Sequence, residues 1–231
     1  MDYILAAFVG ALRLILSLDR EVFTIALLSL RIAGTATVLA TVLGVPLAYS
    51  IATREFPGKS AVLTVFNTLM ALPTVLVGLF GYAFLSRRGP LGFLDLLFTP
   101  SGVILGDVIL ALPLVAALTI AAVNTVDPRA RLTALALGAS SRQTSWTILL
   151  ESRYALMAAV INGFGRVVAE VGSAMMLGGN IRGYTRTLTT AIALETSKGE
   201  FAFGMALGLI LLTLAFTVNL MFRRLQKVAR S

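Results

Sequence analysis

The chain contains neither cysteine nor histidine, and charged residues make up only 13% of its 231 residues. The absence of cysteine excludes disulfides, thiol catalysis and cysteine-held metals, and it leaves no residue from which the redox compartment could be inferred. Without histidine, the usual zinc and haem ligands are also missing, so we expect no metal and no cofactor. The few carboxylates are not clustered, which argues further against an enzyme.

Apolar residues dominate instead, at 58% of the chain with a mean hydropathy of +0.91. These values exclude a soluble fold in favour of an integral membrane protein. A membrane helix needs about 20 mostly apolar residues. Five stretches qualify: residues 32–53, 61–86, 103–126, 154–177 and 201–222. The sequence therefore predicts an all-α polytopic membrane protein of five transmembrane helices, with a membrane domain over residues 21–223 and a basic tail over 224–231.

The net charge of +8 would suggest nucleic acid for a soluble protein, but here it flanks apolar segments and we expect no nucleic-acid partner. Lys and Arg are slightly in excess on the side that carries Arg54, Lys59 and residues 127–153 and 223–230. Acidic residues concentrate on the opposite side. The positive-inside rule then predicts a multi-pass protein of the inner cell membrane, with its amino terminus outside and its carboxyl terminus and residues 127–152 in the cytoplasm.

Residues 1–20 form an apolar start that lacks the marks of a signal peptide. Asp2 replaces the basic start, Arg13 interrupts the apolar run, and no small-x-small cleavage site follows. The apolar residues on one helical face are Ile4, Leu5, Phe8, Leu12, Ile15 and Leu16. We expect an amphipathic helix lying on the outer membrane surface, with a short sixth span as the alternative.

Residues 127–152, between the third and fourth predicted spans, show helical periodicity on either side of Gly138. The apolar residues are Leu132, Leu135, Leu137, Trp146, Ile148 and Leu149. Since glycine has no Cβ to restrict its backbone, the pattern predicts two short amphipathic helices hinged at Gly138. Such an element is typical of a docking site for another protein.

The same segment resembles the cytoplasmic coupling motif of ABC importer permeases, which runs Glu-Ala-Ala, three residues, Gly, nine residues, Ile-x-Leu-Pro. Gly138, Ile148 and Leu150 match it, whereas Glu151 stands in place of the Pro. The resemblance implies contact with an ABC ATPase subunit through Leu132, Thr133, Ala134, Gly138, Ala139, Ser140, Ile148 and Leu150.

Residues 162–201 closely resemble the permease subunits of tungstate importers, and molybdate permeases share the Glu170-x-Gly172 core and the turn at Asn180. The resemblance covers residues 25–222. It implies the type I ABC importer permease fold, a homodimer, a partner ATPase and an extracytoplasmic substrate-binding protein that delivers tungstate or molybdate.

Arg166 and Glu170 lie four residues apart within the fourth predicted span, which predicts a shared helix face. Unpaired charges at the bilayer centre cost about 2.5–3.5 kcal/mol each, so both must face protein, water or each other. One interpretation places them with Gly172 and Ser173 along an oxyanion pathway. The other is a structural ion pair.

Other polar and conformational features of the spans favour structural roles. Asp107 lies close to an outer span end, which favours a solvated acid. Pro46, Pro73 and Pro113 predict kinks or breaks. The small residues of the fourth span, Gly163, Gly165 and Ala174 among them, predict close helix packing.

Outside the membrane, Asn180, Arg182, Tyr184 and Arg186 form a basic turn that is a candidate contact for the binding protein or an anion. Gly58-Lys59-Ser60 ends like a phosphate-binding loop but lacks the earlier glycine, so we expect ATP hydrolysis in a partner. The rival from another class is an ion-coupled secondary transporter using Asp107, Arg166 and Glu170, whose inverted repeat is not seen.

Overall fold

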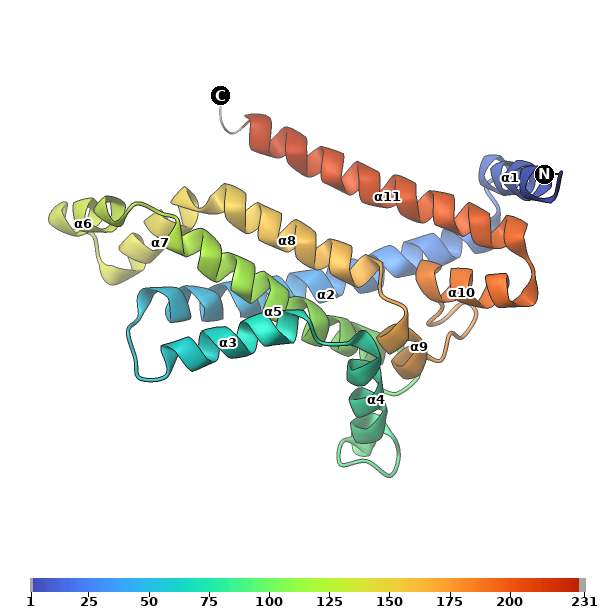
Figure 1. Ribbon diagram of the computed structural model, residues 1–231, viewed down its shortest axis with the longest axis horizontal. Coiled ribbons are helices and arrows are strands. Elements are labelled where there is room, and N and C mark those ends of the chain that lie inside the picture. The colour runs from blue at the N-terminus through green and yellow to red at the C-terminus, as the bar shows by residue number, and fades with distance from the viewer. Residues whose placement is uncertain (1, 229–231) are drawn as a thin grey trace.

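The computed structural model describes residues 2–228, and these are helical without any strand, as predicted. Three helices are long and apolar enough to cross a membrane, and two bent pairs bring the number of candidate spans to five in this described part. The elements are α1 (Asp2–Leu16), α2 (Arg20–Thr53), α3 (Lys59–Met70), α4 (Thr74–Leu85), η1 (Gly92–Leu94), α5 (Pro100–Asn124), α6 (Pro128–Ala136), α7 (Ser141–Glu151), α8 (Arg153–Val168), α9 (Gly172–Gly178), α10 (Leu188–Lys198) and α11 (Phe201–Val228) (Figure 1).

Helix α5 forms the centre of the bundle and packs against α2, α3, α8 and α9. Its contact with α2 is built from small side chains: Ala33, Ala36 and Ala40 of α2 cluster with Ala111 of α5 and are almost fully buried. Small residues let membrane helices approach closely, which gives more van der Waals contact where no hydrophobic force drives association. This packing holds α5 where two broken spans can meet beside it.

Two of the five predicted spans are broken rather than straight. Between α3 and α4 the chain turns by 98°, and between α8 and α9 by 60°. Pro73 stands at the first break, as predicted from its missing backbone donor, whereas Pro46 and Pro113 lie inside the continuous helices α2 and α5. The second break contains no proline and was not predicted.

Close packing along α8 explains its glycines only in part. A Cβ on Gly163 would lie 2.7 Å from Val115 Cγ2 of α5, whereas a Cβ on Gly165 would meet nothing within 4 Å. Gly163 therefore permits the contact between α5 and α8. Gly165 does not.

This difference gives a matched pair of substitutions on one helix. We expect Gly163→Ala to destabilise the protein by roughly 1–3 kcal/mol, because the added methyl overpacks the contact with Val115. Gly165→Ala should be neutral or stabilising by about 0.5–1 kcal/mol, since alanine favours a helix over glycine. Thermal unfolding of both purified variants in one detergent measures the difference, and equal shifts would contradict the packing argument.

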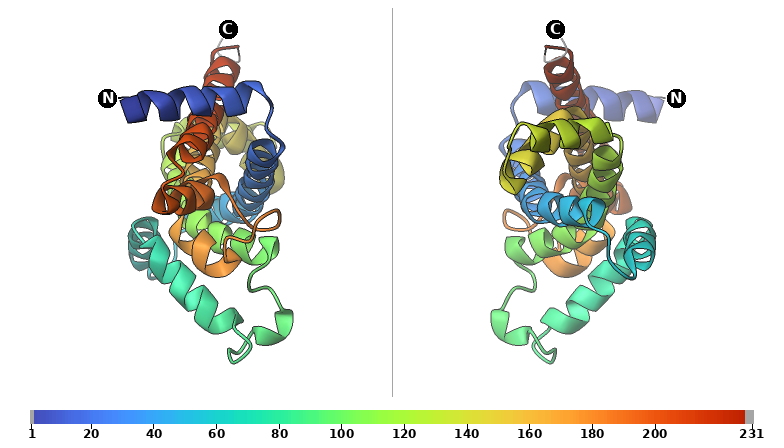
Figure 2. Two further views of the ribbon diagram at one scale, coloured as in Figure 1. Left: turned by 90° about the vertical axis from the view of Figure 1, so that its right-hand side faces the viewer. Right: turned by 90° about the vertical axis from the view of Figure 1, so that its left-hand side faces the viewer.

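The predicted amino-terminal helix is present as α1, and it packs across the start of α11 (Figure 2). Its small side chains face that helix: Ala7 and Ala11 are buried, and a Cβ on Gly10 would lie 3.1 Å from Ala202 Cβ. The large residues Ile4, Leu5 and Leu16 point outward, and each is at least 67% exposed. A position on the outer membrane surface remains a prediction.

The two ends of the bundle carry different helices and loops. Helices α6 and α7 and the turn between α2 and α3 lie at one end, whereas α1 and α10 lie at the other (Figure 1). Helix α11 continues to Val228, into the predicted tail. Residues 229–231, including Arg230 of the charge count, lie outside the described part of the chain.

Candidate functional site

The two broken spans meet at their breaks. Arg166, in the last turn of α8 and half-buried, donates from Nη2 to the carbonyl oxygen of Leu72 at 3.4 Å, beside the break between α3 and α4. Leu72 precedes Pro73, and the first-turn amides of Leu76 and Val77 bond to the Pro73 carbonyl instead. Arg166 therefore partners a carbonyl that the break leaves outside the helical hydrogen-bond pattern.

The prediction that Arg166 and Glu170 share a helix face is wrong. Helix α8 ends at Val168, so Glu170 lies beyond it, and the two residues form none of the ion pairs found within residues 2–228. Glu170 instead turns back on the next helix, where its Oε1 accepts the amide of Ser173 at 2.9 Å. Its own carbonyl accepts the Thr189 hydroxyl. Local capping by Glu170 stabilises the break that sequence periodicity missed.

Gly172 and Ser173 belong to the same meeting point. A Cβ on Gly172 would lie 3.0 Å from Thr74 Oγ1, so a larger residue there would crowd the contact between the start of α9 and the start of α4. Ser173 is 1% exposed, and its hydroxyl has no hydrogen-bond partner among the described residues. The four residues predicted for a pathway are thus brought together in space, although not as a helix face.

Asp107 is a second buried acid in this region, and its predicted position in solvent is wrong. Expected as a solvated acid at a span end, it is 2% exposed on α5, and its Oδ1 lacks a hydrogen-bond partner within residues 2–228. The adjacent Gly106 gives α9 room, because a Cβ there would meet Leu177 Cδ1 at 2.6 Å. Asp107 is buried because α5 packs against α2, α8 and α9, which span length and sequence position do not reveal.

This arrangement offers one cationic group and two buried acids around two helix breaks. A guanidinium can attract an oxyanion through charge-assisted hydrogen bonds. Breaks in spans expose backbone polar groups, which membrane proteins tolerate where they are buried in protein or line a cavity.

A second candidate site is the helical hairpin at the opposite end. The predicted pair of helices is confirmed as α6 and α7, and Gly138 between them has a φ of +80°. Asp127 caps α6 by accepting the Arg129 amide at 2.8 Å, and Ser140 forms a capping box with Gln143 at the start of α7. Local sequence thus determines both helix starts and the turn that joins them.

The hairpin presents an apolar surface. Leu132, Leu137, Trp146 and Leu150 are exposed, Ala134 and Ala139 are half-exposed, and a groove of about 700 Å³ runs past Trp146 and Leu149. Ile148, which the motif places in the contact set, is only 5% exposed and packs inward. Trp146 is not among the contact residues that the motif implies, although it belongs to the helical pattern of apolar residues that predicted the docking element.

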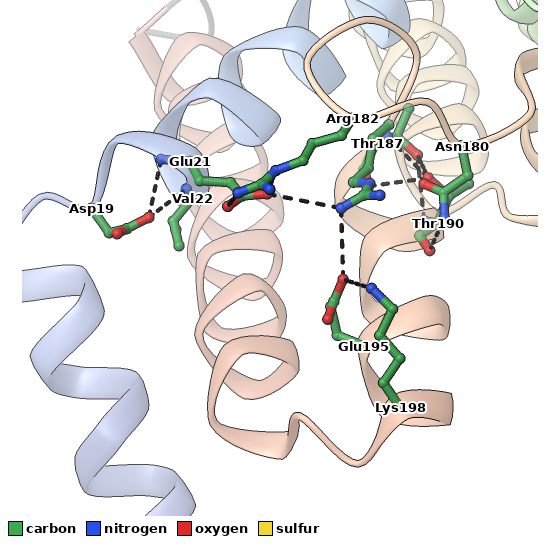
Figure 3. Close-up of polar contacts among 10 residues, drawn as sticks. Asp19, Glu21, Val22, Asn180, Arg182, Thr187, Thr190, Glu195 and Lys198 are labelled. Carbon is green, nitrogen blue, oxygen red and sulfur yellow. Dashed lines mark hydrogen bonds and ion pairs between the residues drawn. The ribbon is translucent and has the colours of Figure 1, made fainter.

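Asn180, Arg182, Tyr184 and Arg186 lie on the turn between α9 and α10, away from the hairpin α6–α7 (Figure 1). Figure 3 shows Asn180 and Arg182 with their polar partners. Arg182 donates from Nε to Glu21 Oε1 at 2.6 Å, and this bond raises the pKa of the Arg182 guanidinium. Arg186 Nη1 lies 3.8 Å from Glu21 Oε1 and 3.6 Å from Glu195 Oε1, which Lys198 also contacts at 3.0 Å.

These ion pairs change the interpretation of the turn. Two of the four predicted contact residues serve the fold: the Arg186 side chain is 11% exposed, and Asn180 donates to the Thr190 carbonyl at 3.3 Å. Arg182 and Tyr184 remain exposed to a partner. Because Glu21 and Glu195 neutralise the arginines, the turn is a weaker attractor for anions than its sequence suggested.

Five membrane-length segments, two broken spans meeting at buried polar groups, and an exposed helical hairpin define a helical membrane transport subunit. The sequence profile of the binding-protein-dependent transport system inner membrane component family matches residues 40–231. The chain belongs to this family.

Similar proteins from several organisms agree. The chain is 37% identical to the tungstate uptake system permease protein TupB of Peptoclostridium acidaminophilum, over 98% of this chain and 100% of that protein. It is 41% identical to the TupB protein of Campylobacter jejuni, over 98% and 95% of the two chains. A probable anion ABC transporter permease protein of Haloferax volcanii is 42% identical, over 85% and 87%. The chain is thus a transporter subunit rather than an enzyme.

Proposed function

We propose that this chain is the permease subunit of an ATP-driven tungstate importer. The observation that carries the proposal is the likeness to tungstate uptake permeases along almost the whole chain. The exposed hairpin supports it, because the pair α6–α7 offers an apolar docking surface for an ATPase. A separate binding protein supplies the anion and contacts the outer turn through Arg182 and Tyr184.

In this mechanism the meeting point of the two breaks is the translocation pathway. Arg166 holds the Leu72 carbonyl in the described state, and an arriving oxyanion competes for the same guanidinium. Glu170 keeps the start of α9 capped while the spans shift, and its negative charge prevents Arg166 from becoming a trap. ATP hydrolysis in the partner moves the hairpin and alternates access from one side to the other.

The assembly that fits this role is a homodimer in the inner membrane, with the hairpin in the cytoplasm. One chain carries one hairpin, whereas an importer of this family engages two ATPase subunits. Helix α4 also departs from the bundle and leaves Leu79, Phe80 and Phe84 about half exposed or more. A second copy against this apolar face is consistent with two permeases enclosing one pathway.

The test is uptake by vesicles that contain the permease, the ATPase and the binding protein. We expect ATP-dependent accumulation of radiolabelled tungstate, and none when the ATPase is omitted. Purified permease alone should neither bind nor hydrolyse ATP, because the Gly58-Lys59-Ser60 segment lacks the earlier glycine of a phosphate-binding loop and follows helix α2 rather than a strand. Uptake driven by an ion gradient without the ATPase would establish a secondary transporter instead. Preferential uptake of molybdate would reassign the substrate and keep the class.

A further inference from the structure

A cavity of about 240 Å³ separates the end of α2 from the helical hairpin. Arg54 follows the last turn of α2, and Arg131 lies on α6; both line this cavity. Hydroxyl groups surround them, from Ser50 and Thr53 on α2 and from Ser141 and Ser145 on α7. Seen along the bundle, these elements lie around the same end of the molecule (Figure 2). Two exposed arginines from separate elements therefore line one polar recess.

Neither arginine is neutralised by an acid within residues 2–228. The nearest carboxylates in sequence have other partners: Glu55 pairs with Lys59 at 2.8 Å, and Asp127 caps α6 through the Arg129 amide. This distinguishes the recess from the outer turn, where Glu21 and Glu195 balance the arginines. The recess has an uncompensated charge of two, which favours a doubly charged anion.

The remaining groups of the recess suit the same ligand. Thr53 and Ser145 donate their hydroxyl hydrogens to the Tyr49 and Ser141 carbonyls, at 2.8 and 2.9 Å, so in this state the two arginines are the main donors available to an anion. Helix α7 begins at Ser141, and its positive end adjoins the cavity. The volume is below the ~300–1,000 Å³ of sites for drug-sized ligands, which points to a small ion.

We infer that this recess binds one tetrahedral oxyanion, either a free ion such as phosphate or tungstate or the phosphate of an anionic lipid. Guanidinium groups recognise such oxygens through paired, charge-assisted hydrogen bonds. An anion held by both Arg54 and Arg131 ties the hairpin to α2. Its presence therefore restrains the element that we assign to the ATPase contact. The cytoplasmic location of the recess and its effect on the ATPase contact rest on the proposed function, whereas the binding of an anion to the recess does not.

Titration of the full-length purified permease in an uncharged detergent, with sodium phosphate and sodium tungstate, tests the binding. We expect one anion per chain whose binding depends on Arg54 and Arg131, with an affinity about 10–100-fold weaker in Arg54→Gln or Arg131→Gln, as for loss of a charged hydrogen bond. Arg129→Gln is the matched control, because Arg129 is exposed on the same helix as Arg131 and does not line the cavity. A further anion that is lost in Arg166→Gln would belong to the proposed pathway and would be counted separately.

A second arm distinguishes the sources of the phosphate. The permease in phosphatidylcholine nanodiscs, with and without phosphatidic acid, is assayed for retained lipid by mass spectrometry. Retention of phosphatidic acid that needs Arg54 and Arg131 identifies the lipid, and free-ion binding with the same dependence identifies the soluble anion. The inference would be overturned if neither the free anion nor phosphatidic acid bound, or if all variants bound equally. It would also be overturned if the Arg54 and Arg131 variants lost only copurification of the ATPase, which would indicate that the arginines contact an acidic surface of the ATPase. Because the permease is titrated alone, failure of the uptake assay leaves this result intact.

Discussion

Arg166→Met is expected to lower tungstate uptake by about 10–100-fold, because it removes a group whose charge-assisted hydrogen bonds contribute about 1.5–3 kcal/mol each. Its partner in the described state, the Leu72 carbonyl, would lose its hydrogen bond. Arg166→Lys keeps the charge but not the planar fork, so we expect an intermediate rate. Initial uptake rates in the reconstituted system provide the measurement.

Stability separates a pathway role from a packing role. If Arg166 only clamps the Leu72 carbonyl, the fall in uptake should match the fall in thermal stability, and Lys should rescue both. If it serves the anion, uptake falls further than stability. Arg153→Met, at the exposed start of the same helix, controls for loss of an arginine. Full uptake in a folded Arg166→Met variant would move the pathway elsewhere.

The separate partners of Arg166 and Glu170 predict that mutations at the two positions act independently on stability. Since Arg166 and Glu170 have different partners, Arg166→Met and Glu170→Gln should change stability additively. A structural ion pair would instead show coupling, and removing both charges would often be neutral or stabilising. A double-mutant cycle on thermal unfolding decides between these outcomes.

Gly138→Val is expected to abolish most ATPase-coupled uptake while membrane insertion stays normal. The φ of +80° at this position is strained for a β-branched residue, at a cost of roughly 1–3 kcal/mol. The expected effect comes from the backbone and not from a clash within the chain, because a Cβ at Gly138 would meet nothing within 4 Å. The hairpin would relieve the strain by changing the angle between α6 and α7.

Gly138→Asn is the matched control, since asparagine adopts the left-handed conformation more readily than other residues with a Cβ. We expect Asn to retain ATPase copurification and most uptake, and Val to lose both. Equal loss in the two variants would indicate that the ATPase covers Gly138 itself. Normal uptake with both would remove the hairpin from the coupling role.

Local sequence was sufficient wherever local interactions decide the structure. The five apolar segments, the two hairpin helices and the turn at Gly138 follow from periodicity, span length and capping, which involve neighbouring residues only. Proline was a weaker guide: Pro73 stands at a break, whereas Pro46 and Pro113 lie inside continuous helices although they lack the same amide. The class of protein and its family resemblance follow from the same segments.

Tertiary structure decided what each polar residue contacts. Spacing placed Arg166 and Glu170 on one face, but Glu170 caps α9 and Arg166 reaches a carbonyl 94 residues away in sequence. Arg186 looked free until Glu21 and Glu195, from other helices, were brought beside it. Asp107 looked solvated until α5 was buried on several sides. A charged side chain in a membrane protein pairs with a polar group that helix packing brings close to it, because an unpaired charge inside the membrane is costly. Sequence periodicity contains no information about that partner.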